Sequence, residues 1–423
     1  MDRSIEKTLR AWKEGTLRYP LLIRGARQVG KTFIIEKFGK EFFESFERIN
    51  FEAQPEAIAF FESLDPREIL QRIETWTKRP IRPGKTLLFL DEIQACPKAI
   101  LALRYFKEKM PELHVIGAGS LLEFTLIQGK FSFPVGRVQF AYMHPLSFQE
   151  FTKGLGYQLD SHEAAIRHVK EYFLVGGMPA AVQHYKGSHS LLECSQIQDI
   201  LLGTYKADFN KYATEAEQKY LRIAFDGIPS SVGEQIKYSK IDDQVKSREL
   251  KTAIQQLEWA GLVHPIYATS ASGIPLKAQI KQNKVKPLFL DIGLLQRSLE
   301  VDPELIWTKD LIEINAGALA EQFVAQELLA YRDAFRDESL YFWTREKGDA
   351  EVDYILSTEN QIIPIEVKAG KYGKLRSIRQ FMHEKKAPIG ICISQKPLSF
   401  ENGILFIPFY RIEEIPILVK KYL

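Results

Sequence analysis

The sequence of 423 residues lacks the features of a membrane protein, a disulfide-bonded scaffold and a zinc protein. No run approaches the ~18 apolar residues of a membrane span, and the N-terminus has no apolar signal-peptide core. Cys96, Cys194 and Cys392 lie far apart without C-x-x-C spacing, and the eight histidines show no ligand spacing. We therefore expect a cytoplasmic protein of a reducing compartment that has no membrane contact.

An excess of charge of one sign is also missing. The 57 basic and 54 acidic residues leave a net charge of +3, so any surface that binds nucleic acid must be a local one. The length suggests about two to four domains, and no internal repeat or low-complexity tract interrupts them.

A phosphate-binding loop is predicted close to the N-terminus. The pattern G-x-x-x-x-G-K-[ST] follows the apolar run 21–23 and precedes a helix over 33–38. Glycines let backbone N–H groups surround the phosphates, Lys31 reaches the β and γ oxygens, and Thr32 offers a hydroxyl to Mg²⁺. The context favours this motif over an accidental glycine-containing turn and predicts ATP and Mg²⁺ as cofactors. The predicted binding residues are Gly25, Ala26, Arg27, Gln28, Val29, Gly30, Lys31, Thr32 and Phe33.

A second apolar strand, 86–91, ends in two adjacent carboxylates. Asp91 is predicted to hold Mg²⁺ through its water shell, and Glu92 to activate the water that attacks the γ-phosphate. The alternative is a solvated Asp-Glu pair at a strand end, and the upstream phosphate loop favours the catalytic interpretation.

Two further residues are candidates near the nucleotide. Ser120 follows the strand 114–118, where it is either a sensor of the γ-phosphate or an N-cap for the next helix. Arg137 is either a cationic finger on the nucleotide of a neighbouring subunit, which implies a homo-oligomer, or a surface arginine. Arg24 and Arg27 also flank the loop, and position alone does not rank the arginines.

The alternation of strands and helices, together with the phosphate loop, predicts an α/β protein whose first part is a parallel-sheet P-loop ATPase. Helical periodicity follows, then three helices with a hairpin, then a small α/β unit. The predicted division is an ATPase core over 1–150, a helical connector or lid over 151–214, a winged helix over 215–305 and a terminal domain over 306–423.

The winged-helix segment offers a basic helix and a basic wing. Its helix, 247–260, places Arg248 and Lys251 opposite its apolar face. Such a module could set its helix in the major groove of DNA while the wing contacts phosphates. The alternative is a structural module that packs between its neighbours. The wing carries Lys277, Lys281, Lys284 and Lys286.

Segments 22–32, 90–94 and 144–151 resemble those of prokaryotic AAA-like ATPases fused to a C-terminal domain of unknown function. The resemblance covers nearly the whole chain. It implies an ATPase core of the ASCE or AAA-like type, with its catalytic glutamate on an added strand, a winged helix and a nuclease-like terminal domain. Residues 176–179 resemble the Gly-Gly-x-Pro element of that family, which the resemblance links to nucleotide state, and 287–295 resemble its signature after the wing.

The terminal domain contains three acids and a lysine in a suggestive arrangement. Glu366 and Lys368 are two residues apart on a predicted strand and therefore share a face. A turn over 357–360 would set Asp353 opposite Pro364, on the same side as Glu366 but diagonal to it. Glu321 projects from the otherwise apolar face of the helix 318–329.

These residues match what metal-assisted hydrolysis of a phosphodiester requires. Asp353 and Glu366 are predicted to bind Mg²⁺, Glu321 to complete the acidic set, and Lys368 to stabilise the developing negative charge. The pattern resembles the PD-(D/E)xK superfamily, with Val352 in place of the proline, and implies a restriction-endonuclease-like fold. The alternative is a salt-bridged structural relic.

The leading hypothesis is an ATPase that couples nucleotide state to a Mg²⁺-dependent nuclease acting on DNA. The first alternative is an ATP-driven switch or scaffold whose terminal domain only binds nucleic acid or a protein partner. A second alternative is a nuclease whose ATPase region only senses nucleotide. Each predicts a different response to loss of Glu92 or Lys368.

Overall fold

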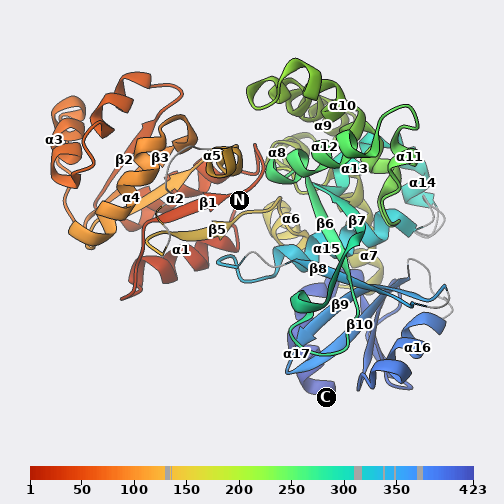
Figure 1. Cartoon of the computed structure of the whole chain (residues 1–423). Helices are drawn as coiled ribbons and strands as arrows, with labels where there is room; N and C mark the ends of the chain where they lie inside the picture. The colour runs from red at the N-terminus through yellow and green to blue at the C-terminus, as the bar shows by residue number, and fades with distance from the viewer. Residues whose placement is uncertain (129–133, 135, 309–316, 337–338, 347–348, 369–374) are drawn as a thin grey trace. The chain divides into compact units, whose positions relative to one another are not determined.

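The structure is a computed structural model that divides into two compact units (Figure 1). One unit comprises Met1–His144 with two short later pieces, and the other comprises nearly all of the remainder. Across this described part, no helix has both the length and the apolar character needed to cross a membrane. The described residues are 1–128, 134, 136–308, 317–336, 339–346, 349–368 and 375–423.

The first unit is built on a five-stranded sheet in the order β2-β3-β4-β1-β5, and every neighbouring pair is parallel. This confirms the predicted parallel α/β arrangement. Strand β4 lies between β1 and β3, so the phosphate loop and the acidic strand end lie on strands that are not direct neighbours. The strands are β1 Leu21–Arg24, β2 Ser45–Asn50, β3 Thr86–Asp91, β4 His114–Ala118 and β5 Gln139–Tyr142.

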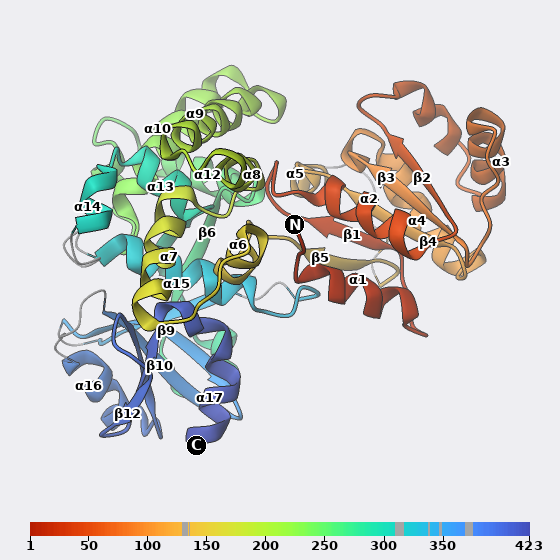
Figure 2. The ribbon, with the colours of Figure 1, turned by 180° about the vertical axis from the view of Figure 1, so that it is seen from behind.

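Helices pack around this sheet and bury its central strands (Figure 2). Residues 87–90 of β3 have no exposed surface, as expected for a strand covered on both faces. The α-helices are α1 Ile5–Glu14, α2 Lys31–Phe42, α3 Pro66–Thr77, α4 Pro97–Lys109 and α5 Leu122–Gln128, and the 3₁₀ helices are η1 Pro55–Phe61 and η2 Ile93–Ala95.

The second unit begins with a helical layer. Helices α10, α11 and α12, followed by the hairpin β6–β7, have the element order predicted for a winged helix, whose identity stays a prediction. The α-helices are α6 Phe148–Leu155, α7 His162–Val175, α8 Pro179–Ser188, α9 Leu191–Asp208, α10 Glu215–Gly227, α11 Tyr238–Ile241, α12 Ser247–Trp259, α13 Ile292–Ser298, α14 Pro303–Thr308, α15 Ala318–Ala330, α16 Arg376–Lys385 and α17 Ile415–Tyr422. The 3₁₀ helices are η3 Phe209–Lys211, η4 Ile228–Ser231, η5 Leu276–Gln279 and η7 Phe409–Glu414.

An eight-stranded sheet runs through the second unit in the order β12-β13-β11-β10-β9-β8-β6-β7. The hairpin β6–β7 joins the terminal strands because β6 pairs in parallel with β8. The boundary at 305 stays a prediction, although strands from both of its sides share one sheet. The strands are β6 Val263–Thr269, β7 Ile280–Phe289, β8 Leu340–Thr344, β9 Glu351–Thr358, β10 Gln361–Lys368, β11 Gly390–Ser394, β12 Ser399–Glu401 and β13 Ile404–Pro408.

The turn between β9 and β10 is shorter than predicted. Only Glu359 and Asn360 lie between the strands, with φ of 48° and 58°, as a two-residue hairpin turn requires. The register pairs Pro364 with Ile355, so the predicted pairing of Pro364 with Asp353 is wrong. The shift is by two residues, which preserves the alternation of faces, and continuing the register by one residue sets Asp353 opposite Glu366.

Buried polar side chains connect helix α15 to three segments whose sequences resemble those of the AAA-like ATPase family. Glu327 accepts the Phe148 N–H at 3.0 Å, at the start of α6. Asp291 accepts the Gly177 N–H at 2.6 Å and lies 3.4 Å from the Gln326 amide nitrogen. The segments 144–151, 176–179 and 287–295, distant in sequence, are thus held by one helix.

Candidate functional site

The phosphate loop connects β1 to α2 through backbone conformations that favour glycine. Gly25 and Gly30 have φ of 144° and 97°, and a Cβ on Gly25 would lie 2.2 Å from the Met143 carbonyl oxygen. Helix α2 begins directly after Gly30, so its first N–H groups point into the loop. Within the loop Val29 is buried and Arg27 half-buried, and the Phe33 side chain is 59 % exposed just after it.

Lys31 is held inside the loop by the carbonyl groups of the loop itself. Its Nζ donates to the carbonyl oxygens of Gly25 and Ala26, both at 2.8 Å. Burial lowers the Lys31 pKa to about 8, and the nearby charges of Glu92 and Asp91 oppose that fall. The Lys31 ammonium group therefore lies inside the loop and loses its proton more readily than that of an exposed lysine.

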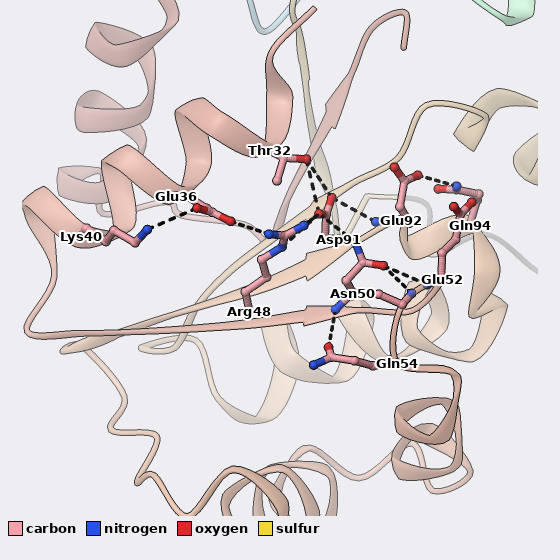
Figure 3. Close-up of polar contacts among 11 residues, drawn as sticks. Thr32, Glu36, Lys40, Arg48, Asn50, Glu52, Gln54, Asp91, Glu92 and Gln94 are labelled. Carbon is pink, nitrogen blue, oxygen red and sulfur yellow. Dashed lines mark hydrogen bonds and ion pairs between the residues drawn. The ribbon is translucent and has the colours of Figure 1, made fainter. Parts of the chain in front are cut away.

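Asp91 ends β3 and is almost fully buried among hydrogen-bond donors (Figure 3). Thr32 Oγ1 donates to its Oδ1 at 3.2 Å, and Arg48 contacts Oδ2 through Nη2 at 2.6 Å and Nε at 3.1 Å. Burial raises the pKa of Asp91, while Arg48 acts in the opposite direction. The pairing of Thr32 with Asp91 is the arrangement predicted for a shared Mg²⁺.

Arg48 was not predicted to belong to the site. It lies on β2 two residues before Asn50, and the register pairs Asn50 with Asp91. Asn50 also approaches Asp91, with Nδ2 at 3.3 Å from Oδ2. No local motif marks Arg48, because its role depends on β2 being the neighbour of β3 in the sheet.

Glu92 has a left-handed backbone and a side chain directed away from Asp91 (Figure 3). The Gln94 amide nitrogen donates to Glu92 Oε2 at 2.7 Å. A Cβ on Gly119 would lie only 1.9 Å from Gln94 Oε1. Gly119, at the end of β4, therefore leaves the space in which Gln94 holds Glu92.

Ser120 lies near the carboxyl ends of the parallel strands, and Arg137 lies near their amino ends. Ser120 follows the carboxyl end of β4, which pairs with the end of β1 that leads into the phosphate loop, and it is buried. Arg137 precedes β5, whose first residue pairs with Leu21 at the other end of β1. Its Nε contacts Glu108 Oε1 at 3.0 Å. Arg137 is thus far from the phosphate loop along the strand direction, and a role as a finger requires another subunit.

A second candidate site lies on β10 of the second unit. Glu366 is buried, and its Oε1 forms an ion pair with Lys368 Nζ at 2.6 Å. Its Oε2 is buried and has no hydrogen-bond partner within the described part of the chain. Across the hairpin, Asp353 Oδ2 accepts the Val367 N–H at 2.7 Å. The predicted acid pair and its lysine are therefore together, with one buried carboxylate oxygen that lacks a donor.

Lys286 of β7 is also part of this site. Its side chain is 3 % exposed, and its Nζ lies 2.6 Å from Glu351 Oε1 and 3.5 Å from Glu321 Oε2. The prediction that Lys286 contacts DNA phosphates from the wing is wrong, because its side chain is buried and paired with Glu321 of α15 and Glu351 of β9. Glu351 was not predicted to take part.

Burial makes the carboxyl groups of this cluster weak acids. Burial and, second to it, the charge of Asp353 together raise the pKa of Glu366 to about 7 and that of Glu321 to about 8. Burial raises the pKa of Asp353 as well, while Lys286 lowers it. Without added positive charge, this cluster retains protons near neutral pH.

The terminal site contains oxygen ligands suited to a divalent cation. In the described residues, no three or more His, Cys, Asp or Glu side chains are grouped so that they could hold a metal. Asp353 and Glu366 supply carboxylate oxygens of the kind that Mg²⁺ prefers, and Glu366 Oε2, which lacks a partner among the described residues, is suited to a cation. The site therefore fits one cation held by two carboxylates, while Glu321 faces Lys286.

The comparisons with known proteins bear on the first of these sites. Residues 17–152 match the family model described as an AAA domain, and this range contains the phosphate loop, Asp91 and Glu92. Residues 17–152 form an AAA-like ATPase domain. The cofactors of the AAA-like domain are ATP and Mg²⁺, in agreement with the pairing of Thr32 and Asp91.

Two further family models match the chain beyond the AAA-like domain. Residues 166–305 match a domain of unknown function (DUF8612), and residues 316–412 match another (DUF4143). No match was found among curated proteins.

Solved structures similar to this chain include three P-loop proteins. A Walker-type ATPase of Pyrococcus abyssi is 16 % identical with a TM-score of 0.46, over 70 % of this chain and 95 % of that one. The Aeropyrum pernix ORC2 protein is 12 % identical with a TM-score of 0.37, over 72 % and 92 %. The RuvB Holliday junction branch migration motor of Thermotoga maritima is 15 % identical with a TM-score of 0.31, over 61 % and 87 %. With TM-scores below 0.5, none of these similarities indicates what this chain binds.

Proposed function

We propose that this chain couples ATP hydrolysis in its AAA-like domain to Mg²⁺-dependent cleavage of DNA by its terminal sheet. The environment of Glu366 is the observation that best supports nuclease activity. This buried carboxylate pairs with Lys368 through one oxygen, finds no partner for the other among the residues that the structure describes, and lies across the hairpin from Asp353. A buried acceptor without a partner is costly, so its presence favours a site that receives a cation.

The AAA-like domain supplies the residues for ATP hydrolysis. Lys31 and the loop N–H groups bind the phosphates, and Thr32 and Asp91 hold Mg²⁺, which neutralises phosphate charge. Glu92 accepts a proton from the attacking water, and Gln94 sets its orientation. Ser120, at the same edge of the sheet, is positioned to contact the γ-phosphate, and Arg137 would act in a homo-oligomer.

The terminal site supplies the residues for phosphodiester hydrolysis. Asp353 and Glu366 would hold one Mg²⁺, which supplies electrophilic activation of the phosphate and of a water molecule. Lys368 places its ammonium group beside Glu366, where it stabilises negative charge on the phosphate oxygens during attack. The remaining lysines of the wing, such as Lys277 and Lys284, would contact DNA phosphates.

A plasmid-nicking assay with Mg²⁺ and ATP tests this proposal. Wild-type protein should convert supercoiled to open-circular DNA, and Lys368→Ala should reduce the rate by at least about 100-fold. Lys396→Ala is a matched control, because Lys396 forms a comparable 2.7 Å ion pair with Glu401 in the same sheet. Absence of nicking by folded wild-type protein under every nucleotide condition would contradict the nuclease proposal.

A second function is favoured by the buried Lys286. Because its ammonium group already pairs with Glu321 and Glu351, the cluster could be structural, and the chain an ATP-driven switch whose terminal sheet only binds DNA or a protein. In that case Lys368→Ala would leave DNA binding and ATP turnover unchanged, and nicking would be absent throughout. If the ATPase region only senses nucleotide, Glu92→Gln would abolish turnover and leave cleavage unchanged.

A further inference from the structure

Lys286 is the most deeply buried charged group of the terminal site, and no motif assigns it a role. It reaches the cluster from β7, whereas the acids come from α15, β9 and β10. Its Nζ contacts Glu351 at 2.6 Å and Glu321 at 3.5 Å, and it lies 5.3 Å from the centre of the Phe342 ring. The second oxygen of Glu351 accepts a hydrogen bond from Gln235 Nε2 at 3.0 Å. Lys286 is therefore fixed from several sides.

The charges of the cluster balance if one divalent cation is added. Four carboxylates face two ammonium groups, which leaves two negative charges when every group is ionised. The two ammonium groups divide the acids, with Lys286 between Glu321 and Glu351 and Lys368 beside Glu366. The carboxylates are those of Glu321, Glu351, Asp353 and Glu366.

The distribution of partners shows where that cation would lie. The Glu321 and Glu351 side of the cluster is occupied by the Lys286 ammonium group. On the other side, Glu366 Oε2 is buried and has no partner in the described ranges of the chain, and Asp353 lies across the hairpin from it. A lysine ammonium group and a metal ion cannot share the same carboxylate oxygens without strong repulsion.

We propose that Lys286 is a built-in cation that takes the place of a second metal ion, so that this site accepts a single divalent cation, at Asp353 and Glu366. The inference rests on the proposed nuclease function and specifies its metal requirement. Two-metal sites stabilise both the attacking and the leaving oxygen. Here the ammonium group of Lys286 supplies the second positive charge.

Counting bound Mn²⁺ on the full chain without nucleotide tests this inference. Wild-type protein should bind one Mn²⁺ that Asp353→Asn removes, and comparison with Asp353→Asn subtracts Mn²⁺ bound elsewhere. Lys286→Met should bind one Mn²⁺ more than wild type, because Glu321 and Glu351 then lack a cation. The double variant Lys286→Met/Glu351→Gln should again bind the same number of Mn²⁺ ions as wild type. Lys281→Met is the matched control, since Lys281 on the same strand pairs with the exposed Glu346.

The outcomes separate the inference from the proposed function. If Lys286→Met binds the same number of Mn²⁺ ions as Lys281→Met, Lys286 does not occupy a cation position and the inference is overturned. If wild type binds no Mn²⁺ that depends on Asp353, the proposed nuclease site fails instead. Circular dichroism verifies that each variant is folded. If Lys286→Met does not fold, Lys286→Gln takes its place, because glutamine keeps a hydrogen-bond donor for Glu351, and the expected number of bound Mn²⁺ ions is the same.

Discussion

Replacing Arg48 with methionine should destabilise the AAA-like domain without nucleotide and have little effect once Mg²⁺ and ATP are bound. In the structure Arg48 is the cationic partner of the buried Asp91, with two nitrogens within 3.1 Å of one carboxylate oxygen. Methionine preserves much of the side chain's volume but leaves Asp91 with only neutral donors, among them Thr32 and Asn50. A bound Mg²⁺ supplies the missing positive charge.

The expected magnitude follows from the exposure of the pair. A hydrogen bond to a charged group contributes roughly 1.5–3 kcal/mol, and because the Arg48 side chain is 34 % exposed we expect a loss of about 2 kcal/mol. For a unit of this size, about 2 kcal/mol lowers the melting temperature by about 6 °C. With Mg²⁺ and ATP, the difference from wild type should shrink to below about 2 °C.

Thermal unfolding followed by circular dichroism measures both differences. Glu92→Gln serves as the background for every sample so that ATP is not consumed during the scan. Arg79→Met is the control, because Arg79 is 73 % exposed and lies 3.9 Å from Glu47, an arrangement that contributes less than about 0.5 kcal/mol. An Arg48→Met difference that is equally large in EDTA and in Mg²⁺ with ATP would refute the exchange of Arg48 for Mg²⁺ at Asp91.

Three further predictions concern other buried groups. ATP affinity should fall about tenfold between pH 7 and pH 9, because the Lys31 pKa is lowered to about 8 and the side chain loses its charge over this range. Titration calorimetry at several pH values measures the affinity, and a constant affinity would contradict the prediction. The Glu327 pKa is raised from 4.5 to about 8 by burial, so the protonated form is favoured in the folded state and stability falls as pH rises from 4.5 to 8. Glu327→Gln keeps an acceptor for the Phe148 N–H but cannot ionise. Between pH 5.5 and 7.5 its free energy of unfolding, measured with urea, should therefore fall by about 2.5 kcal/mol less than that of wild type. An equal fall in the two proteins would count against the prediction. Gly177→Ala should destabilise the second unit by more than about 2 kcal/mol, because the Cβ of the alanine would lie 2.1 Å from the Leu146 carbonyl oxygen. An unchanged midpoint of urea unfolding would show instead that the backbone relaxes to make room for it.

The AAA-like domain was predictable because its motifs are local. The loop glycines, Lys31 and Thr32 act through eight consecutive residues, and Asp91 and Glu92 mark the end of a single buried strand. Arg48 and Gln94 could not be found in this way. The first depends on strand order in the sheet, and the second on the left-handed backbone of Glu92 and the space beside Gly119.

The terminal site was predicted in its residues but not in its geometry. The segment 357–360 consists of polar, turn-forming residues, so the sequence does not reveal that only Glu359 and Asn360 form the turn. The register error was even, and the shared face of Asp353 and Glu366 therefore survived it. Lys286 looks like the other lysines of the wing, and only the non-local pairing of β6 with β8 distinguishes it.

We infer that ATP is hydrolysed in the AAA-like domain with Glu92 as the base. Phosphate release by wild type and by Glu92→Gln, measured beside ATP binding by both proteins, is the decisive experiment. The structure predicts that both proteins bind ATP, because Lys31, Thr32 and Asp91 are unaltered, and that the variant releases phosphate at least about 100-fold more slowly. Equal rates of release by the two proteins would show that Glu92 is not the base, and no release by folded wild type would contradict the claim itself.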